Sequence, residues 1–491
     1  MAMKKFVILS ITLLFALSAQ ALEFTVDNLK YTTNADSTSV TVKKSAIMPA
    51  GDLVIPSHVT YNGKKYAVIR VEGFSGCTEL TSVTIPEGVT SIENGTFDYC
   101  ISITSITVPK SVISIGGYAF NECMSLTSIT IPEGVKSIEQ RTFYGCSSLV
   151  SITLPESITS IGEEAFLVCT SLASIHIPSN VTSIGSAAFY FCKSLSSIAI
   201  PEGVTSIEQY VFYDCSSLSS IMLPATLTSI GESAFGNCSS LSSITFPASL
   251  TSIGVVAFRG CSKITSITIP KSVTSIKVGA FWGCSSLVSI TIPEGITSIE
   301  QSVFDDCSSL TSVKIPVSVT SIVENAFFGC SSLTSIILPD NLSSIGAYAF
   351  YKCSALQEIY IRNSTPPICN ISGDDQYNVF VKVDKSTCKL YVPIGSKAAY
   401  AAANEWKDFE NIEEIDMTSV PTSKETPFII YTDDDGMTIT GVEPGATITV
   451  YTITGTKLLT LPATGDKQRI ALSSGGIYFV KVGNQVKKIA F

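Results

Sequence analysis

Apolar residues recur along most of this chain with a fixed period of 23 residues. The repeated unit reads Cys-x-x-Leu-x-x-Ile-x-Ile-Pro-x-x-Val-x-x-Ile-x-x-x-Ala-Phe-x-x, and its phase holds without insertion or deletion from Cys77 to Cys353. A fixed period of about 20 to 50 residues is typical of one supersecondary unit stacked along an axis. The pattern therefore predicts a solenoid with one coil per unit.

Each unit predicts the same short elements. Leu-x-x-Ile-x-Ile ends in the period-two alternation of a strand, and the following proline ends that strand because it has no N–H to donate. Val-x-x-Ile predicts a second extended stretch, and the Ala-Phe segment predicts a helical or 3-10 turn. We expect the first strands to form one parallel sheet. Two columns should point inward, phenylalanines from Phe74 to Phe350 and isoleucines from Ile69 to Ile345.

The sequence on both sides of the repeats differs from the unit. Alternating segments at 24–26 and 40–43 predict a strand pair, and Asn62-Gly63 predicts a tight hairpin. Residues 390–392 and 398–406 predict a strand and a helix that close the other end. The expected organisation is a signal peptide at 1–21, an N-terminal β cap at 22–46, the solenoid at 47–362, a C-terminal cap at 363–416, a linker at 417–427 and a small β-sandwich at 428–491.

Composition and the N-terminus place the protein outside the cell. Lys4 and Lys5, the apolar run from Phe6 to Leu17 and a small-x-small site ending at Ala21 predict a secretory signal peptide. No later run of about 18 apolar residues follows, so we expect no membrane span after cleavage. Charged residues are only 15% of the chain, the net charge is −10 and no basic stripe occurs, which argues against a nucleic-acid partner.

Thirteen of the 15 cysteines follow the repeat, one per unit. All share one phase, so we expect small, buried, reduced side chains. Disulfides between neighbouring coils remain an alternative, and metal binding is a weaker one because no Cys-x-x-Cys spacing occurs. Cys369 and Cys388 lie outside the repeat, and a disulfide between them is an open possibility.

With these motifs in view, the unit Cys-Ser-Ser-Leu-Thr-Ser-Ile-Thr-Ile-Pro-Glu-Gly-Val-Thr-Ser-Ile resembles the BspA-like leucine-rich repeats of bacterial and protist surface proteins. The resemblance covers about residues 47–361. It implies an α/β leucine-rich repeat solenoid, mostly parallel β with short helical or 3-10 turns, and a role in attachment to host matrix proteins or other cells. It implies no chemistry.

The C-terminal region carries a second resemblance. The segment from Gly445 to Gly455 and the ending at 476–482 are similar to C-terminal sorting domains of the type IX secretion route. The Asn-Pro opening usual in those domains is missing here. The resemblance implies a sorting or anchoring role, and location in the medium or on the exterior of the outer membrane.

The sequence offers little for catalysis or for a cofactor. Its two histidines, His58 and His176, lie in separate coils without a partner set. Asp433-Asp434-Asp435-Gly436 lacks the other positions of a calcium loop and predicts a solvated turn. We therefore expect no enzyme, no cofactor and no metal site.

Two rows of side chains are candidates for binding. On the strand face the outward positions are mostly Ser and Thr, so specificity should come from the departures, which are His176, Met222, Lys314 and Tyr360. A second row directly follows the core phenylalanines and contains Tyr144, Tyr190, Tyr213, Trp282, Phe328 and Tyr351. The alternative for this row is packing against the next coil.

These observations lead to one functional hypothesis and two rivals. The first is a non-enzymatic, secreted or cell-surface adhesin-like protein that attaches to extracellular proteins. A glycan-binding accessory protein is the first rival, favoured if the aromatic row is exposed and planar. A structural component of the cell surface is the second. The sequence does not indicate an oligomeric state.

Overall fold

The computed structural model describes residues 21–370 and 378–418. In the C-terminal region it describes 429–433, 436–440, 442, 446–452, 456–463, 467–471, 477–482 and 485–490. Residues 1–20 of the predicted signal peptide, residues 419–427 of the predicted linker, and Asp434 and Asp435 lie outside the described residues.

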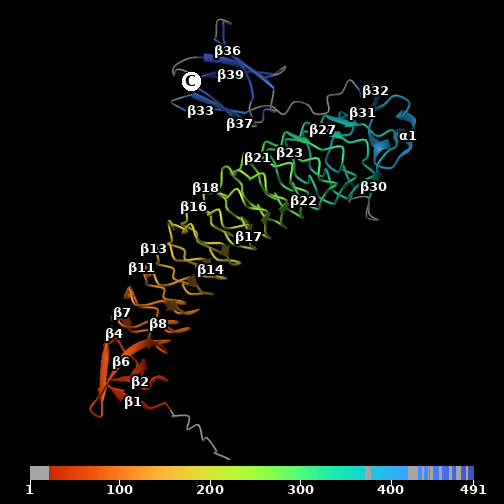
Figure 1. The fold of residues 1–491 in the computed structure, drawn as a ribbon. Coiled ribbons are helices and arrows are strands. Elements are labelled where there is room, and N and C mark those ends of the chain that lie inside the picture. The colour runs from red at the N-terminus through yellow and green to blue at the C-terminus, as the bar shows by residue number, and fades with distance from the viewer. Residues whose placement is uncertain are drawn as a thin grey trace, which may run out of the picture.

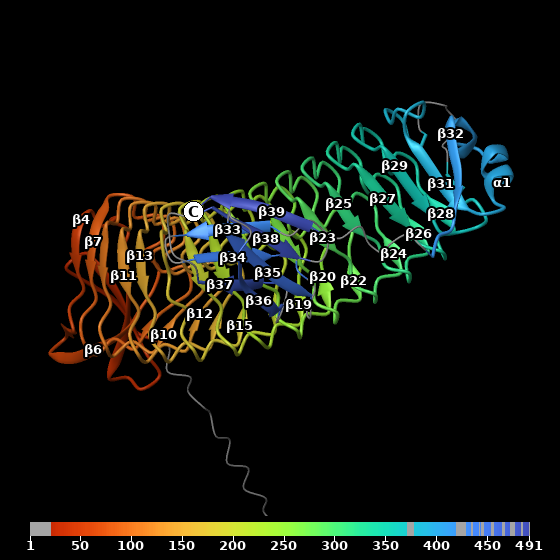
Figure 2. The same cartoon turned by 90° about the horizontal axis from the view of Figure 1, so that it is seen from above.

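The repeats stack into a curved solenoid, and each typical coil contributes two short strands (Figure 1). Strands of neighbouring coils pair in parallel with a register of one repeat, as in Ser128↔Ser151 and Ser137↔Ser160. The two kinds of strand form separate rows (Figure 2). The leucine-rich solenoid expected from the period is therefore confirmed, but its strands form two parallel rows and not one sheet.

The first row comes from Leu-x-x-Ile-x-Ile. It is interrupted near Ser174, where an isolated bridge joins Ser197. Its strands are β4 (Gly51–Val54), β7 (Leu80–Thr84), β9 (Ser105–Thr107), β11 (Ser128–Thr130), β13 (Ser151–Thr153), β16 (Ser197–Ala199), β18 (Ser220–Met222), β21 (Ser266–Thr268), β23 (Ser289–Thr291), β25 (Ser312–Lys314), β27 (Ser335–Leu338), β29 (Glu358–Ile361), β31 (Lys389–Pro393) and β32 (Asn411–Ile415).

The second row comes from the Ser-Ile pair of Val-x-x-Ile. Most of its strands have two residues, because a tight turn follows directly. They are β6 (Lys64–Val71), β8 (Ser91–Ile92), β10 (Ser114–Ile115), β12 (Ser137–Ile138), β14 (Ser160–Ile161), β15 (Ser183–Ile184), β17 (Ser206–Ile207), β19 (Ser229–Ile230), β20 (Ser252–Ile253), β22 (Ser275–Ile276), β24 (Ser298–Ile299), β26 (Ser321–Ile322), β28 (Ser344–Ile345) and β30 (Ile368–Cys369).

The segment that carries the phenylalanine is a hydrogen-bonded turn and not the expected helical turn. Around Phe143, Arg141 and Gly145 adopt left-handed backbone angles, with φ of 53° and 69°. The amides of Arg141, Phe143 and Gly145 donate to carbonyls of the next coil at 3.0, 2.9 and 2.8 Å. Left-handed residues on both sides of the phenylalanine thus let every second amide point along the solenoid axis, which continuous helical angles would prevent.

The core is a stack of phenylalanine rings. From Phe74 to Phe350 each ring lies on the next, at centroid distances from 5.1 to 6.0 Å. Phe380 continues the column at 5.5 Å from Phe350, although it stands outside the 23-residue period. The stack is fully buried along the repeats, which accounts for the phenylalanine at this position in every repeat.

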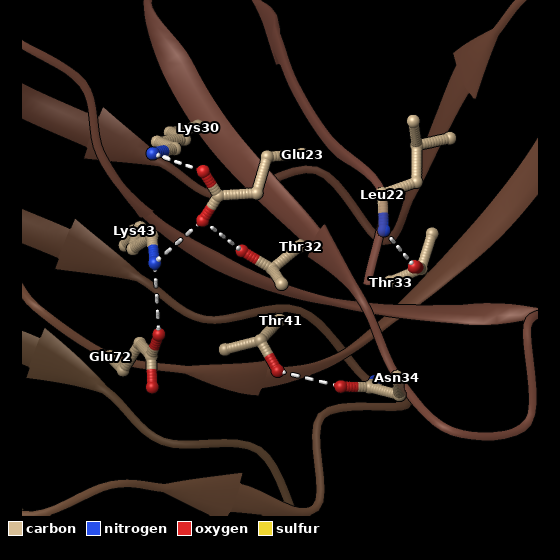
Figure 3. Close-up of polar contacts among 9 residues, drawn as sticks. All are labelled: Leu22, Glu23, Lys30, Thr32, Thr33, Asn34, Thr41, Lys43 and Glu72. Carbon is tan, nitrogen blue, oxygen red and sulfur yellow. Dashed lines mark hydrogen bonds and ion pairs between the residues drawn. The ribbon is translucent and has the colours of Figure 1, made fainter. Parts of the chain in front are cut away.

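An N-terminal sheet closes the first coil. The expected strand pair has a third strand between its members, so that β1 (Glu23–Val26), β2 (Leu29–Thr33) and β3 (Ser39–Lys44) are antiparallel, and β3 then pairs with β6 in parallel. Figure 3 shows that Glu23 joins the strands, with 2.6 Å to Lys30 and 3.6 Å to Lys43, while Lys43 also lies 3.5 Å from Glu72. These charges make the exposed edge at β1 unsuitable for pairing with other chains.

The hairpin at Asn62-Gly63 forms between β5 (His58–Tyr61) and β6, with φ of 50° and 78° at the two turn residues. It also shifts the register of the first coil. Val71, and not Ile69, pairs with Ile92 and begins the inward column. Ile69 was therefore assigned to that column wrongly, because spacing alone does not reveal the two-residue offset in β6.

The C-terminal end is closed by aromatic packing. The expected helix is split into α1 (Lys397–Ala402) and η2 (Trp406–Asp408), because Glu405 has φ of 68°. Trp406 packs on Phe380 at 5.1 Å, and its indole Nε1 donates to the Pro367 carbonyl at 2.9 Å. The cap also accepts hydrogen bonds from the phenylalanine turn of the last repeat, since Phe350 N–H donates to the Val379 carbonyl.

The C-terminal region has two antiparallel sheets over a core of its own, which includes Met437, Ile448 and Val480. One sheet has the order β33-β34-β37 and the other β36-β35-β38-β39. The strands are β33 (Ile429–Asp433), β34 (Gly436–Thr440), β35 (Thr447–Thr452), β36 (Lys457–Pro462), β37 (Lys467–Ile470), β38 (Ile477–Val482) and β39 (Gln485–Ala490).

Candidate binding surfaces

The departures on the strand face do not form one site. Met222 is 72% exposed and His176 is also exposed, with its Nε2 at 3.6 Å from Glu156 Oε1. Lys314 and Tyr360 are half-buried and lie several coils further along. Because parallel stacking keeps each coil at its own level, these four side chains are spread along the solenoid.

Tyr360 is part of a local contact at the C-terminal end of this face. It pairs with Tyr391 across β29 and β31, and the two rings stack at 4.6 Å. Desolvation, and then the neighbouring Glu358 and Tyr391, raise the pKa of Tyr360 to about 12. Its hydroxyl therefore stays protonated at neutral pH. The partner Tyr391 lies in the predicted strand of the C-terminal cap, outside the repeat, so the repeat phase did not identify it as a binding candidate.

Ser and Thr side chains directly before the strands of both rows bond to the solenoid itself. Thr104 Oγ1 donates to the Thr81 carbonyl at 3.1 Å, and Thr228 Oγ1 donates to the Thr205 carbonyl at 2.9 Å. The equivalent hydroxyls of many other coils repeat this bond to the previous coil. A hydroxyl that has already donated its proton offers a partner only its lone pairs. These repeated hydroxyls therefore stabilise the stacking of the coils and offer little specificity to a partner.

The aromatic row is half-buried and largely stacked along the solenoid axis. Tyr190 lies on Tyr213 at 5.0 Å with 12° between the ring planes, and Phe328 lies on Tyr351 at 4.8 Å with 16°. The second face of Tyr213 is also covered, since a Cβ at Gly236 would lie only 2.8 Å from its Cδ2. The row therefore presents mostly ring edges and hydroxyl groups to solvent.

Each group of rings carries a cation, which the sequence analysis did not foresee. Arg141 lies 5.6 Å from the Tyr118 centroid and 5.3 Å from that of Tyr144, and Arg259 covers Trp282 at 4.2 Å. Further along, Lys352 lies 5.5 Å from Phe328 and 5.3 Å from Tyr351. Cation–π contacts of this kind need the two side chains on adjacent coils or at nearby phases. In the sequence, Arg141, Arg259 and Lys352 each lie within two residues of a core phenylalanine, and this position would have identified them.

One carboxyl group interrupts the row. Asp305 directly follows the core phenylalanine in the coil between those of Trp282 and Phe328. It is 8% exposed. Its burial, followed by the nearby charge of Asp306, raises the pKa of this carboxyl to about 6. The row is therefore sensitive to pH at one point.

The thirteen repeat cysteines are buried, as expected, and are free thiols in the structure. From Cys100 onward each Sγ donates to the carbonyl of the core phenylalanine in the previous coil, for example Cys192 to Phe166 at 3.2 Å. From Cys123 onward burial raises the pKa of these thiols, that of Cys284 to about 12, whereas the interaction with Cys100 lowers the pKa of Cys77. A thiol of this kind forms little thiolate and is a poor nucleophile. Cys369 and Cys388 are also free thiols here.

Among the described residues no three His, Cys, Asp or Glu side chains gather in a way that could hold a metal ion. In that same part of the chain, no helix is both long and apolar enough to cross a membrane.

Comparison with known proteins identifies the family of this chain. The family described as BspA type leucine rich repeat region matches in six copies, over residues 67–193, 159–288 and 251–372. A leucine-rich repeat protein from Bacteroides ovatus is 30% identical, with a TM-score of 0.60 over 80% of this chain and 100% of its own. A leucine rich cell surface protein from Faecalibacterium prausnitzii is 29% identical over 74% of this chain and 98% of its own, with a TM-score of 0.44. No curated protein matches the chain.

Proposed function

Because this chain belongs to the BspA-type leucine-rich repeat family, we propose that it is a non-enzymatic attachment protein that binds other extracellular proteins. Host matrix proteins and proteins of other cells are the partner classes. Secretion, or display on the exterior of the outer membrane, is part of the proposal. The observation that carries it is the row of aromatic and cationic side chains along the phenylalanine turns, from Tyr118 to Lys352.

The composition of this row suits a protein partner. Tyrosine, tryptophan and arginine are the residues enriched at binding hot spots. Tyr190, Tyr213, Trp282 and Arg259 offer these groups on successive coils or near to them. Weak contacts repeated along one rigid axis add up to useful avidity.

A glycan-binding role is less well supported by the same row. Sugars bind aromatic residues through an open ring face. In the row, Tyr213 has one face covered by Tyr190 and the other by Gly236, and Trp282 is covered by Arg259. The rings would have to separate before a sugar could stack on them.

An array of immobilised matrix proteins and glycans, probed with the purified protein, tests the proposal. We expect saturable binding to one or more proteins. Replacing Trp282 and Tyr213 with Ala should weaken that binding, and Met222→Ala with Lys314→Ala tests the strand face separately. Binding to glycans alone would support the glycan-binding role. Absence of binding to every protein and glycan would leave the structural surface role.

A further inference from the structure

Four aromatic side chains gather where the row contains Tyr190 and Tyr213. Tyr190, Phe191, Tyr210 and Tyr213 come from two successive coils, and all four are half-buried. Their ring centroids lie 4.7 Å apart for Tyr190 and Phe191, 5.0 Å for Tyr190 and Tyr213, and 5.9 Å for Tyr210 and Tyr213. We call these four residues the aromatic cluster.

Two members of the aromatic cluster occupy positions with left-handed backbone angles. Phe191 and Tyr210 have φ of 61° and 60°, in the left-handed region. Glycine adopts such angles most easily, and it stands at these phases in several other coils, as Gly95 and Gly279 at the phase of Tyr210, and Gly76, Gly145, Gly260, Gly283 and Gly329 at the phase of Phe191. Other coils have large residues there, such as Tyr118 and Tyr348 at the phase of Tyr210, and Tyr99 at that of Phe191. The residue at these two phases therefore varies from coil to coil, and the pair of rings distinguishes the aromatic cluster from its neighbours.

A cation position lies at the edge of the aromatic cluster. The Lys193 Nζ is 4.9 Å from the Phe191 centroid and 3.5 Å from Asp214 Oδ2. Its side chain is 50% exposed, so the amine between the ring and the carboxylate is accessible from solvent. A second carboxylate, Glu232, accepts a 2.7 Å hydrogen bond from the Tyr210 hydroxyl.

Phe191 and Asp214 fit an arginine side chain better than they fit Lys193. A guanidinium can stack flat on Phe191 and bond to both oxygens of Asp214, whereas an ammonium acts as a point charge. The charge of the whole chain, −10, also attracts a basic partner over longer distances.

We propose that the aromatic cluster binds an arginine-rich segment of an extracellular protein, with a partner guanidinium replacing the Lys193 amine between Phe191 and Asp214. This inference rests on the proposed attachment to proteins and names the chemistry of the partner. Lys193 then acts as an internal competitor for the site. Removing its charge should strengthen binding, which an ordinary contact residue would not do.

The experiment measures binding of a fluorescent arginine-rich peptide to the full chain and compares it with the same peptide made with citrulline. Lys193→Gln should tighten binding of the arginine peptide about three- to fivefold, the size of a cation–π contact at an exposed site. Asp214→Asn should weaken it by a similar factor. The citrulline peptide should not respond to either variant.

Lys110→Gln is the matched control. Lys110 is exposed and lies outside the aromatic row, and its replacement changes the net charge equally. Equal effects of Lys193→Gln and Lys110→Gln, or weaker binding with Lys193→Gln, would overturn the inference. If matrix proteins bind but Lys193→Gln has no effect on the peptide, this inference fails and the attachment proposal stands. If the peptide responds but no matrix protein binds, the attachment proposal fails alone.

Discussion

Truncating one ring in the middle of the phenylalanine stack should destabilise the solenoid strongly. Phe212 is fully buried, and its ring lies 5.7 Å from Phe189 and 5.4 Å from Phe235. Phe212→Ala removes a buried side chain at a cost of about 3–5 kcal/mol, and this includes about 0.5–1.5 kcal/mol for each lost ring pair. The coils cannot collapse into the space, because the strand ladders on both sides hold their spacing.

The position of the loss matters as much as its size. Each coil of a solenoid contacts only its neighbours, so a defect in the middle weakens two interfaces and can separate the halves into independent units. Phe74 begins the column and stacks on Phe97 at 5.7 Å, so Phe74→Ala should cost less and affect only the first coils.

Urea denaturation followed by circular dichroism measures the loss of free energy, and hydrogen exchange locates it. Exchange in Phe212→Ala should become faster first in the coils around residues 189–235. Met222→Ala, at a position that is 72% exposed, is the control and should change stability by less than about 0.5 kcal/mol. A cost below about 1 kcal/mol for Phe212→Ala would refute the reasoning, because then the stack would not carry the core.

Three further predictions concern the thiols, the buried carboxyl and the C-terminal region. Thiol reagents should label few cysteines in the native protein and most of them after denaturation, because burial raises the thiol pKa; rapid native labelling would contradict this. Folding raises the pKa of Asp305 from its ordinary value of 3.8 to about 6, so the ionised carboxyl destabilises the folded state. This penalty is absent below pH 3.8 and complete above about pH 6. Asp305→Asn should therefore raise the free energy of unfolding by about 1–2 kcal/mol at pH 8 and change it little at pH 3. An equal effect at both pH values would show that charge is not the cause. Deleting residues 428–491 should leave the thermal unfolding of the solenoid nearly unchanged, because the two regions have separate hydrophobic cores; loss of solenoid structure would contradict this.

The binding surfaces were only partly predictable. The phase directly after the core phenylalanine identified Tyr190 and Tyr213, which do lie together. Phe191 and Tyr210 were missed because their phases hold residues as different as glycine and tyrosine in other coils, and only the left-handed backbone turns both rings toward Tyr190. The strand-face residues depart from the repeat pattern, but stacking at one level per coil keeps His176 and Lys314 apart.

The 23-residue repeat is sufficient to predict the solenoid and its buried columns of side chains. In a stacked repeat, residues 23 apart occupy the same place on adjacent coils, so the spacing of Phe97 and Phe120, or of Cys100 and Cys123, already states which side chains meet. Three other features of the fold can be seen only in the tertiary structure. Phe380 completes the ring stack from outside the repeat, Val71 replaces Ile69 in the first coil, and left-handed residues replace a helical turn so that amides can reach the next coil. These features depend on backbone angles and on contacts between segments of different spacing, and a repeating pattern of residue types specifies neither.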